Sequence, residues 1–120
     1  MQLEELETYK LSMEIAENVW NIVISWDYFA KDTIGKQLVR AIDSVSANLS
    51  EGFGRFHFKE KLHFSYYSRG SLYESKTWLQ KSKNRNMIND EQFEYFEENL
   101  NLISMKLNSY INSTKKQLQK

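Results

Sequence analysis

The chain has no proline and only four glycines in 120 residues, and this scarcity of helix-breaking residues is the strongest constraint on its fold. A proline inside a helix costs about 3 kcal/mol, so its absence leaves long helices unbroken. All-β domains instead need turn residues about every ten positions. The length suits one domain and no linker or composition shift divides it. Residues 1–120 are therefore predicted to form a single all-α domain.

Four segments are predicted to be helices, and three of them carry apolar residues at steps of three and four, the period of an amphipathic helix. The first has them at Leu6, Tyr9, Met13, Ala16, Trp20 and Val23 and is expected to end near Trp26 and Asp27. The second is expected to be capped by Asp32 or Thr33, with core positions at Leu38, Ile42, Val45 and Leu49. Gly52 and Gly54 are expected to end it, since glycine adopts the left-handed cap conformation at little cost.

The third segment runs from about His57 to Arg85, with the least regular pattern and with Leu62, Tyr66, Leu72 and Leu79 as expected core positions. Asn86 is expected to close it. The fourth begins at a well-defined boundary: Asn89 is the predicted N-cap, Gln92 takes the third helical position, and Ile88 can pack on Phe93. Its core positions are Phe93, Phe96, Leu100, Ile103, Leu107 and Tyr110. Short connections predict an antiparallel, up-down-up-down four-helix bundle.

Patterns that indicate catalysis or metal binding are scarce. There is no cysteine, and Gly52-Phe53-Gly54 has no preceding strand, so it indicates a helix end. Glu60 and His63 form one Glu-x-x-His motif, but di-iron bundles need two such motifs and two further glutamates. We predict no enzymatic activity, cofactor or metal site. The acidic start lacks the features of a signal peptide, and no apolar run is long enough to cross a membrane, so a cytoplasmic protein is expected.

A basic segment rich in aromatic residues is the main functional candidate. The net charge is zero, but residues 53–85 hold eight basic residues against Glu60 and Glu74: Arg55, Lys59, Lys61, Arg69, Lys76, Lys81, Lys83 and Arg85. Interleaved with them are Phe53, Phe56, Phe58, Phe64, Tyr66, Tyr67, Tyr73 and Trp78. Cations beside stacking faces suit single-stranded or looped RNA. The same pattern also fits a core stripe with a charged outer face, complementary faces between neighbouring helices, or a subunit interface.

A polar stripe on the second helix allows two interpretations. Arg40, Ser44, Asn48, Glu51 and Arg55 recur at steps of three and four beside the apolar positions. Glu51 and Arg55 can form an exposed ion pair four residues apart, worth a few tenths of a kcal/mol. Alternatively, the stripe belongs to a buried or intersubunit network that fixes register.

The same stripe carries a resemblance to a known family. The run from Gln37 to Gly52 contains Arg40, Ala41, Ser44, Ala47, Asn48 and Glu51 in the pattern Q-x-x-R-A-x-x-S-x-x-A-N-x-x-E-G, and Gly70, Ser71 and Glu74 follow as G-S-x-x-E. This resembles the bacterial family encoded in intervening sequences of large-subunit ribosomal RNA genes, often labelled ribosomal protein, and its relative, the accessory protein of diversity-generating retroelements.

The resemblance implies a four-helix bundle that assembles into a homopentamer, with no enzymatic activity attached to the family. Arg40, Asn48, Glu51, Gly52, Gly70, Ser71 and Glu74 are the matching motif residues, and most are expected to be architectural. Gly70 in mid-helix predicts that another backbone packs closely there. The leading hypothesis is a homo-oligomeric bundle that contacts RNA, or a protein that handles nucleic acid, through the basic third helix. The alternative is a protein-interaction scaffold without a nucleic-acid role.

Overall fold

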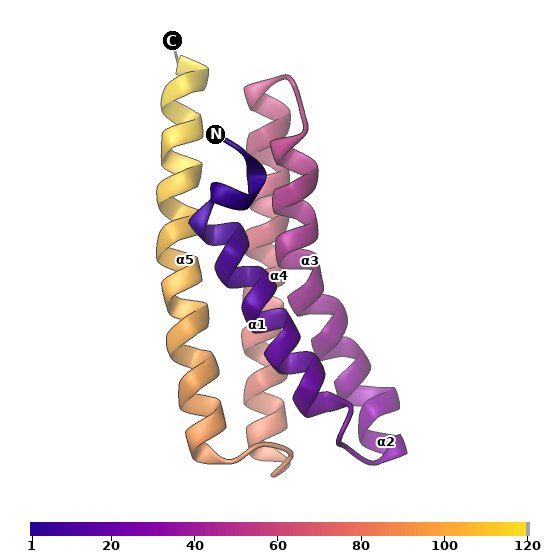
Figure 1. Cartoon of the computed structure of the whole chain (residues 1–120). Coiled ribbons are helices and arrows are strands. Elements are labelled where there is room, and N and C mark those ends of the chain that lie inside the picture. The colour runs from indigo at the N-terminus through magenta and orange to yellow at the C-terminus, as the bar shows by residue number, and fades with distance from the viewer. Residues whose placement is uncertain (120) are drawn as a thin grey trace.

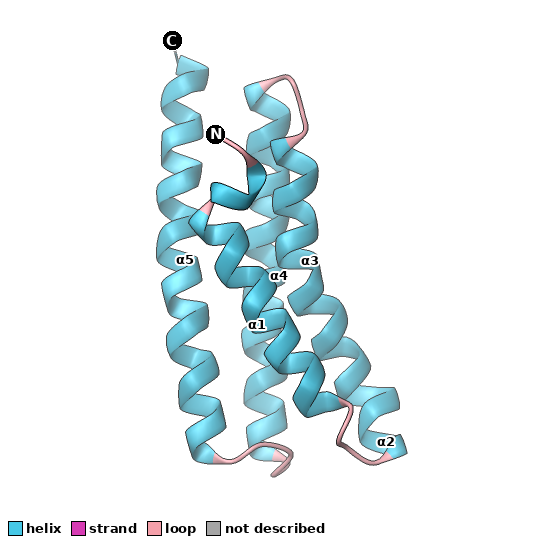
Figure 2. Ribbon diagram, in the orientation of Figure 1, coloured by secondary structure: helices cyan, strands magenta, loops and turns pink. Residues whose placement is uncertain are grey.

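The computed structural model describes residues 1–119, apart from the side chain of Glu4, and within them all regular secondary structure is helical (Figure 2). The long helices are α1 (Glu7–Val23), α3 (Lys36–Phe53), α4 (Phe58–Asn84) and α5 (Asp90–Gln119). A 3-10 turn, η1 (Leu3–Glu5), precedes α1. A short helix, α2 (Tyr28–Ala30), continues through a π-helical turn, η2 (Lys31–Gly35), directly into α3.

The long helices pack side by side in a bundle about 50 Å long (Figure 1). α1 contacts both α3 and α5, and α4 contacts the same two helices. The turn between α3 and α4 lies at the same end as the C-terminal end of α5, while α2 and the turn between α4 and α5 lie at the other end (Figure 1). Within residues 1–119, no helix combines the length and the apolar character needed to cross a membrane.

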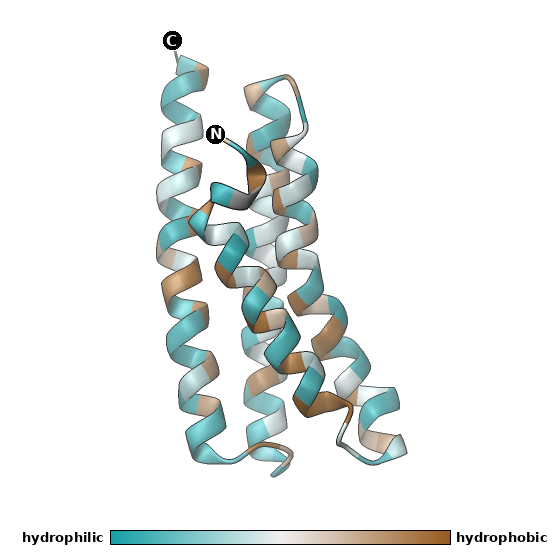
Figure 3. Cartoon of the chain, in the orientation of Figure 1, coloured by the Kyte–Doolittle hydropathy of each residue, from teal (hydrophilic) through white to brown (hydrophobic). Residues whose placement is uncertain are grey.

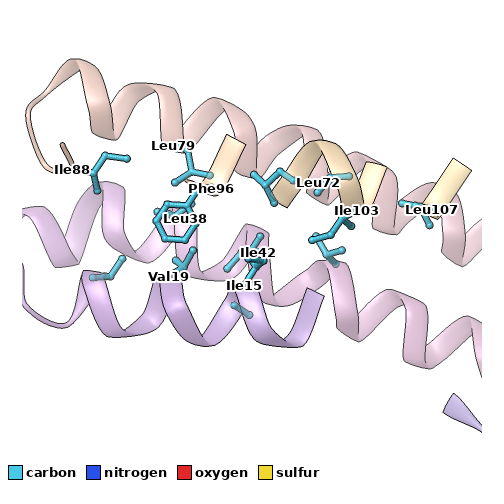
Figure 4. Close-up of a cluster of buried hydrophobic side chains, with 14 of the residues drawn as sticks. Ile15, Val19, Leu38, Ile42, Leu72, Leu79, Ile88, Phe96, Ile103 and Leu107 are labelled. Atoms are coloured by element: carbon cyan, nitrogen blue, oxygen red, sulfur yellow. The ribbon is translucent and has the colours of Figure 1, made fainter. Parts of the chain in front are cut away.

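The core lies along the axis of the bundle, where apolar side chains from all four long helices meet (Figure 4). The predicted core positions Leu38, Ile42, Val45 and Leu49 of α3 and Phe96, Leu100, Ile103 and Leu107 of α5 are buried, which confirms both predictions. At the end of α5 the prediction was wrong by one position: Ile111 is buried and Tyr110 only half-buried. Burial raises the pKa of the Tyr110 hydroxyl.

The predicted core face of the first helix was partly wrong: Leu6, Ala16 and Val23 are buried as predicted, but two of its largest side chains are not. Met13 is 42% and Trp20 is 49% exposed, whereas Thr8, Ser12, Ile15 and Val19 are buried. Two stripes on this helix have the required period, and the one that faces the core begins with small polar residues. The Ser12 hydroxyl donates to the Thr8 carbonyl at 2.7 Å, so burial leaves it satisfied. Met13 and Trp20 of the predicted stripe are left on the outside, and Figure 3 shows that hydrophobic residues recur along α1.

The second helix begins earlier than predicted. Asp27, rather than Asp32 or Thr33, is the N-cap: its carboxylate accepts from the Ala30 amide at 2.9 Å. Lys36 pairs with Asp32 at 3.0 Å inside the continuing helix. Gly54 ends α3 as its C-cap, as predicted. The predicted left-handed conformation was wrong, because Gly54 keeps a right-handed φ of −78°.

Both boundaries of the turn between α4 and α5 were predicted correctly. Asn86 has a φ of 60°, and the Met87 amide donates to the Ser82 carbonyl at 2.8 Å, which closes α4. The Asn89 side chain accepts from the Gln92 amide at 2.7 Å, and the Gln92 side chain accepts from the Asn89 amide at 2.9 Å. This reciprocal pair is a capping box.

The irregular pattern of α4 has a simple cause, which is that serine occupies four of its seven buried positions. The buried residues are Leu62, Ser65, Ser68, Leu72, Ser75, Leu79 and Ser82, at regular steps of three and four. The Ser68 hydroxyl donates across to the Val45 carbonyl of α3 at 2.7 Å. Tyr66, predicted to be in the core, is half-buried at its edge.

Candidate nucleic-acid interface

The structure does not bring the eight predicted basic residues together. Arg55 lies in the turn before α4, Arg85 directly after α4, and the others along its 27 residues. At 1.5 Å per residue this helix is about 40 Å long. The candidates therefore fall into three groups. The group at the α3–α4 turn is Arg55, Lys59 and Lys61, the middle group is Arg69 and Lys76, and the group at the far end is Lys81, Lys83 and Arg85.

The middle group faces α5. Arg69 donates to Asn108 at 3.2 Å, and Lys76 donates to Asn101 at 3.0 Å. Lys83, further along, lies 4.0 Å from Asp90 and 4.5 Å from the centre of the Phe93 ring. These three contacts join α4 to α5, as the alternative of complementary faces between neighbouring helices predicts.

Two basic residues near the α3–α4 turn contact the end of α3. Arg55 pairs with Glu51, which bears out the predicted ion pair, and lies 4.9 Å from the centre of the Phe64 ring. Lys61 donates to the Phe53 carbonyl at 3.0 Å. A cation at this position stabilises the negative end of a helix dipole. Both side chains thus have structural partners within the chain.

The other exposed groups at this end of the bundle are mostly basic and aromatic, with Glu60 of the first turn of α4 as an acidic neighbour. Phe56 is 88% and Phe58 is 42% exposed, and Lys59 is exposed beside them. Lys115 of α5 lies 5.9 Å from the centre of the Tyr66 ring of α4, which brings the C-terminal lysines to the same end. We call Phe56, Phe58, Lys59, Lys115 and Lys116 the turn-end surface. The sequence analysis missed Lys115 and Lys116, although lysines concentrated near the C-terminus were a visible signal.

The far end of α4 is less suited to a polyanion. Lys81 lies 5.9 Å from the centre of the Trp78 ring, and Arg85 is exposed. The first turn of α5 brings Asp90 and Glu91 to the same end of the bundle. These acids reduce the positive potential that a phosphate would meet there.

None of the eight interleaved aromatic residues is fully buried. Phe53, Phe64, Tyr66 and Trp78 are half-buried, and Phe56, Phe58, Tyr67 and Tyr73 are exposed. Leucine and serine fill the core face of α4 instead. Four of these aromatic side chains are therefore exposed on the surface of the single chain, whereas Tyr66 and Trp78 pack against the edge of the core.

Contacts within the chain account for some of the family-motif residues but not for others. Gly52 is explained by packing, because a Cβ there would lie 2.8 Å from Cβ of Phe64. Asn48 donates to the Ser44 carbonyl at 2.8 Å, and Glu74 accepts from the Trp78 indole at 3.1 Å. Gly70 is exposed with nothing within 4 Å of a Cβ placed on it, so the close approach predicted there is not made within this chain.

The other motif residues lie at the surface. Arg40 is exposed and Ser71 half-buried, and Glu51 is exposed in its pair with Arg55. The single chain therefore holds no buried network here, and the intersubunit alternative stays a prediction.

Ionisable groups show no arrangement typical of a metal centre. Glu60 and His63 are both exposed, and within residues 1–119 no group of three or more acidic or histidine side chains is placed to hold a metal ion. Burial, and then the nearby Glu17 of α1, raise the pKa of the Asp43 carboxyl of α3.

Four long helices around one apolar core, with no strand in residues 1–119, define this molecule as a small helical-bundle protein. Residues 4–109 match the sequence model of the 23S rRNA-intervening sequence protein family. The chain belongs to that family, which confirms the resemblance carried by the motif from Gln37 to Gly52 and by Gly70, Ser71 and Glu74.

A solved structure supports the fold. The chain is similar to a protein of unknown function from the S23 ribosomal protein family of Bacteroides thetaiotaomicron, with a TM-score of 0.78 and 21% sequence identity. The match covers 87% of this chain and 97% of the other. No curated protein matches the chain.

Proposed function

We propose that this chain is a non-enzymatic, antiparallel up-down-up-down bundle that assembles into a homo-oligomer, a pentamer, and contacts structured RNA. The family name, which refers to 23S rRNA, supports an RNA association. We assign the RNA contact to the turn-end surface, which is a smaller area than the whole length of the basic helix α4. The sequence also resembles the accessory protein of diversity-generating retroelements. This resemblance supports a second partner, a protein that handles nucleic acid.

The observation that carries the RNA assignment is the exposure of Phe56 and Phe58 among lysines from two helices. An exposed phenylalanine gains little from water but stacks on an unpaired base, at about 1–3 kcal/mol per base. Lys59, Lys115 and Lys116 then lie where they can neutralise the adjoining phosphates. A hairpin RNA with an unpaired loop offers both features.

The test is the affinity for a fluorescently labelled hairpin RNA, measured by anisotropy across a range of salt. We expect affinity to fall steeply with salt, because each phosphate contact releases counterions. Phe56→Ala with Phe58→Ala, and separately Lys59→Glu with Lys115→Glu, should each lower affinity by about tenfold or more. Lys81→Glu with Arg85→Glu is the matched control at the far end and should change it little.

Two outcomes would contradict the RNA assignment. Binding that is absent or insensitive to salt removes the RNA role and favours the alternative, a protein-interaction scaffold. Equal losses in the turn-end and far-end charge reversals would place the contact along the whole of α4. The scaffold alternative has its own support in the exposed apolar side chains of α1.

A further inference from the structure

An apolar groove with a basic rim is left uncovered between α1 and α3. Trp20 and Ile24 of α1 are 49% and 52% exposed and form one wall, and Val39 of α3 forms part of the other. The cationic side chains along its edge are Lys31, Lys36 and Arg40. Large apolar side chains gathered in this way favour contact with another molecule. The cationic rim favours an occupant that is apolar and acidic.

The outer face of α5 has this composition. Tyr95 is 40%, Leu102 is 39% and Met105 is 68% exposed. Glu91 and Glu98 alternate with them, so the five residues follow one another at steps of four and three along one side of the helix. We call Glu91, Tyr95, Glu98, Leu102 and Met105 the α5 outer stripe. All five side chains are exposed in the single chain, and one of them has a partner there: the Tyr95 hydroxyl accepts a hydrogen bond from the Asn18 side chain of α1 at 2.7 Å.

The groove and the stripe lie on different sides of α1. α1 contacts α3 on one side and α5 on the other (Figure 1). One chain therefore cannot bring its own stripe into its own groove. A second copy placed beside it can, and the contact then joins two different surfaces.

Charges match at the same level of the bundle. The first turns of α5, with Glu91 and Glu98, lie at the end where the segment from Lys31 to Lys36 leads into α3 (Figure 1). A rotation about an axis parallel to the bundle keeps each residue at its own level, so this charge match can form between two copies.

We propose that the α5 outer stripe of one copy of this chain docks in the α1–α3 groove of a second copy. The proposal rests on the self-assembly proposed above and names the two surfaces that make it. Because the surfaces differ, the contact is heterologous, and repeating it produces a ring when the rotation closes. Glu98 of one copy then lies against Lys36 of the next, whose ammonium it shares with Asp32, the partner of Lys36 at 3.0 Å within its own chain.

Neighbouring glutamates of α5 provide a matched test. Glu98 lies on the outer stripe, whereas Glu97 lies toward α4, beside Lys76. By sedimentation equilibrium, Glu98→Lys and Lys36→Glu should each raise the concentration at which half of the protein dissociates by about tenfold. Glu97→Lys makes the same charge change on the side of α5 that faces α4. It should raise this dissociation concentration by less than about threefold. Combining Lys36→Glu with Glu98→Lys in one chain should restore assembly.

The outcomes separate this inference from the proposed function. A wild-type chain that stays monomeric at every concentration overturns both the self-assembly and the docking contact. A wild-type oligomer that Glu98→Lys does not weaken, or that Glu97→Lys weakens equally, overturns the docking contact alone. The same holds if the combined variant fails to recover. Circular dichroism of each variant establishes that the helices remain formed.

Discussion

The two motif glycines, Gly52 and Gly70, should respond in opposite ways to the same substitution. Both lie inside helices, and neither has a positive φ. Alanine is favoured over glycine in a helix by about 1 kcal/mol, because it restricts the unfolded chain. Gly52→Ala and Gly70→Ala therefore start with the same gain in helix stability, and any difference between them comes from the surroundings.

Those surroundings differ sharply. A Cβ on Gly52 would lie 2.8 Å from Cβ of Phe64 and 3.3 Å from the Lys61 carbonyl oxygen, both of which are fixed to the backbone of α4. A Cβ on Gly70 has nothing within 4 Å. Forcing a methyl group into a packed contact costs about 1–3 kcal/mol. Taking about 2 kcal/mol, Gly52→Ala lowers the free energy of unfolding by about 1 kcal/mol and Gly70→Ala raises it by about 1 kcal/mol.

The melting temperature gives the readout. For 120 residues, the unfolding entropy corresponds to about 0.25 kcal/mol per kelvin. Thermal unfolding followed by circular dichroism should therefore place Gly70→Ala about 4 °C above the wild type and Gly52→Ala about 4 °C below it. If Gly52→Ala raised the melting temperature as much as Gly70→Ala does, the close approach of α3 and α4 at Gly52 would be refuted.

Two further predictions concern single side chains. Asn89→Ala removes the acceptor of the 2.7 Å hydrogen bond from the Gln92 amide, so it should lower the free energy of unfolding by about 1 kcal/mol. Denaturant titration measures this change, and an unchanged midpoint would argue against the capping box. Asp43 has a raised pKa, so the fold binds its proton more tightly than the unfolded chain does, and this contribution to stability is lost as pH rises through the folded pKa. Asp43→Asn should therefore raise the melting temperature near neutral pH but not at a pH below the ordinary aspartate range, and an equal gain at both pH values would contradict the shift.

The sequence was most informative where local chemistry decides the structure. The boundary at Asn89 and Gln92 was predicted because each side chain bonds a backbone group three residues away, a contact independent of the rest of the fold. The core faces of α3 and α5 were predicted because the most continuous apolar stripe on each helix is also the one that packs in the core. In both cases local preference and tertiary packing agree.

The sequence was least informative where two solutions compete. α1 has two stripes of the same period, and hydropathy favours the one with Met13 and Trp20 over the one with Ser12 and Ile15. Only the position of α3 and α5 decides between them. On α4, the buried serines hid a regular pattern, because a count of apolar residues treats a satisfied hydroxyl as a surface group.

The candidate site could be predicted only in part. The sequence identified the basic and aromatic character of residues 53–85 but not the partners that Arg69, Lys76 and Lys83 find on α5. The contribution of Lys115 depends on where the last turns of α5 end, which is a property of the whole bundle. Spacing along one helix does not carry that information.

The serines between α3 and α4 also affect how stability changes with temperature. Exposure of apolar surface raises the heat capacity of unfolding, whereas exposure of polar surface lowers it. Ser65, Ser68, Ser75 and Ser82 place small hydroxyl-bearing side chains where a typical bundle has leucine. The heat capacity change is therefore smaller than for a leucine-filled interface of the same length. A smaller change flattens the curve of unfolding free energy against temperature, so the bundle retains more of its maximum stability toward both cold and heat.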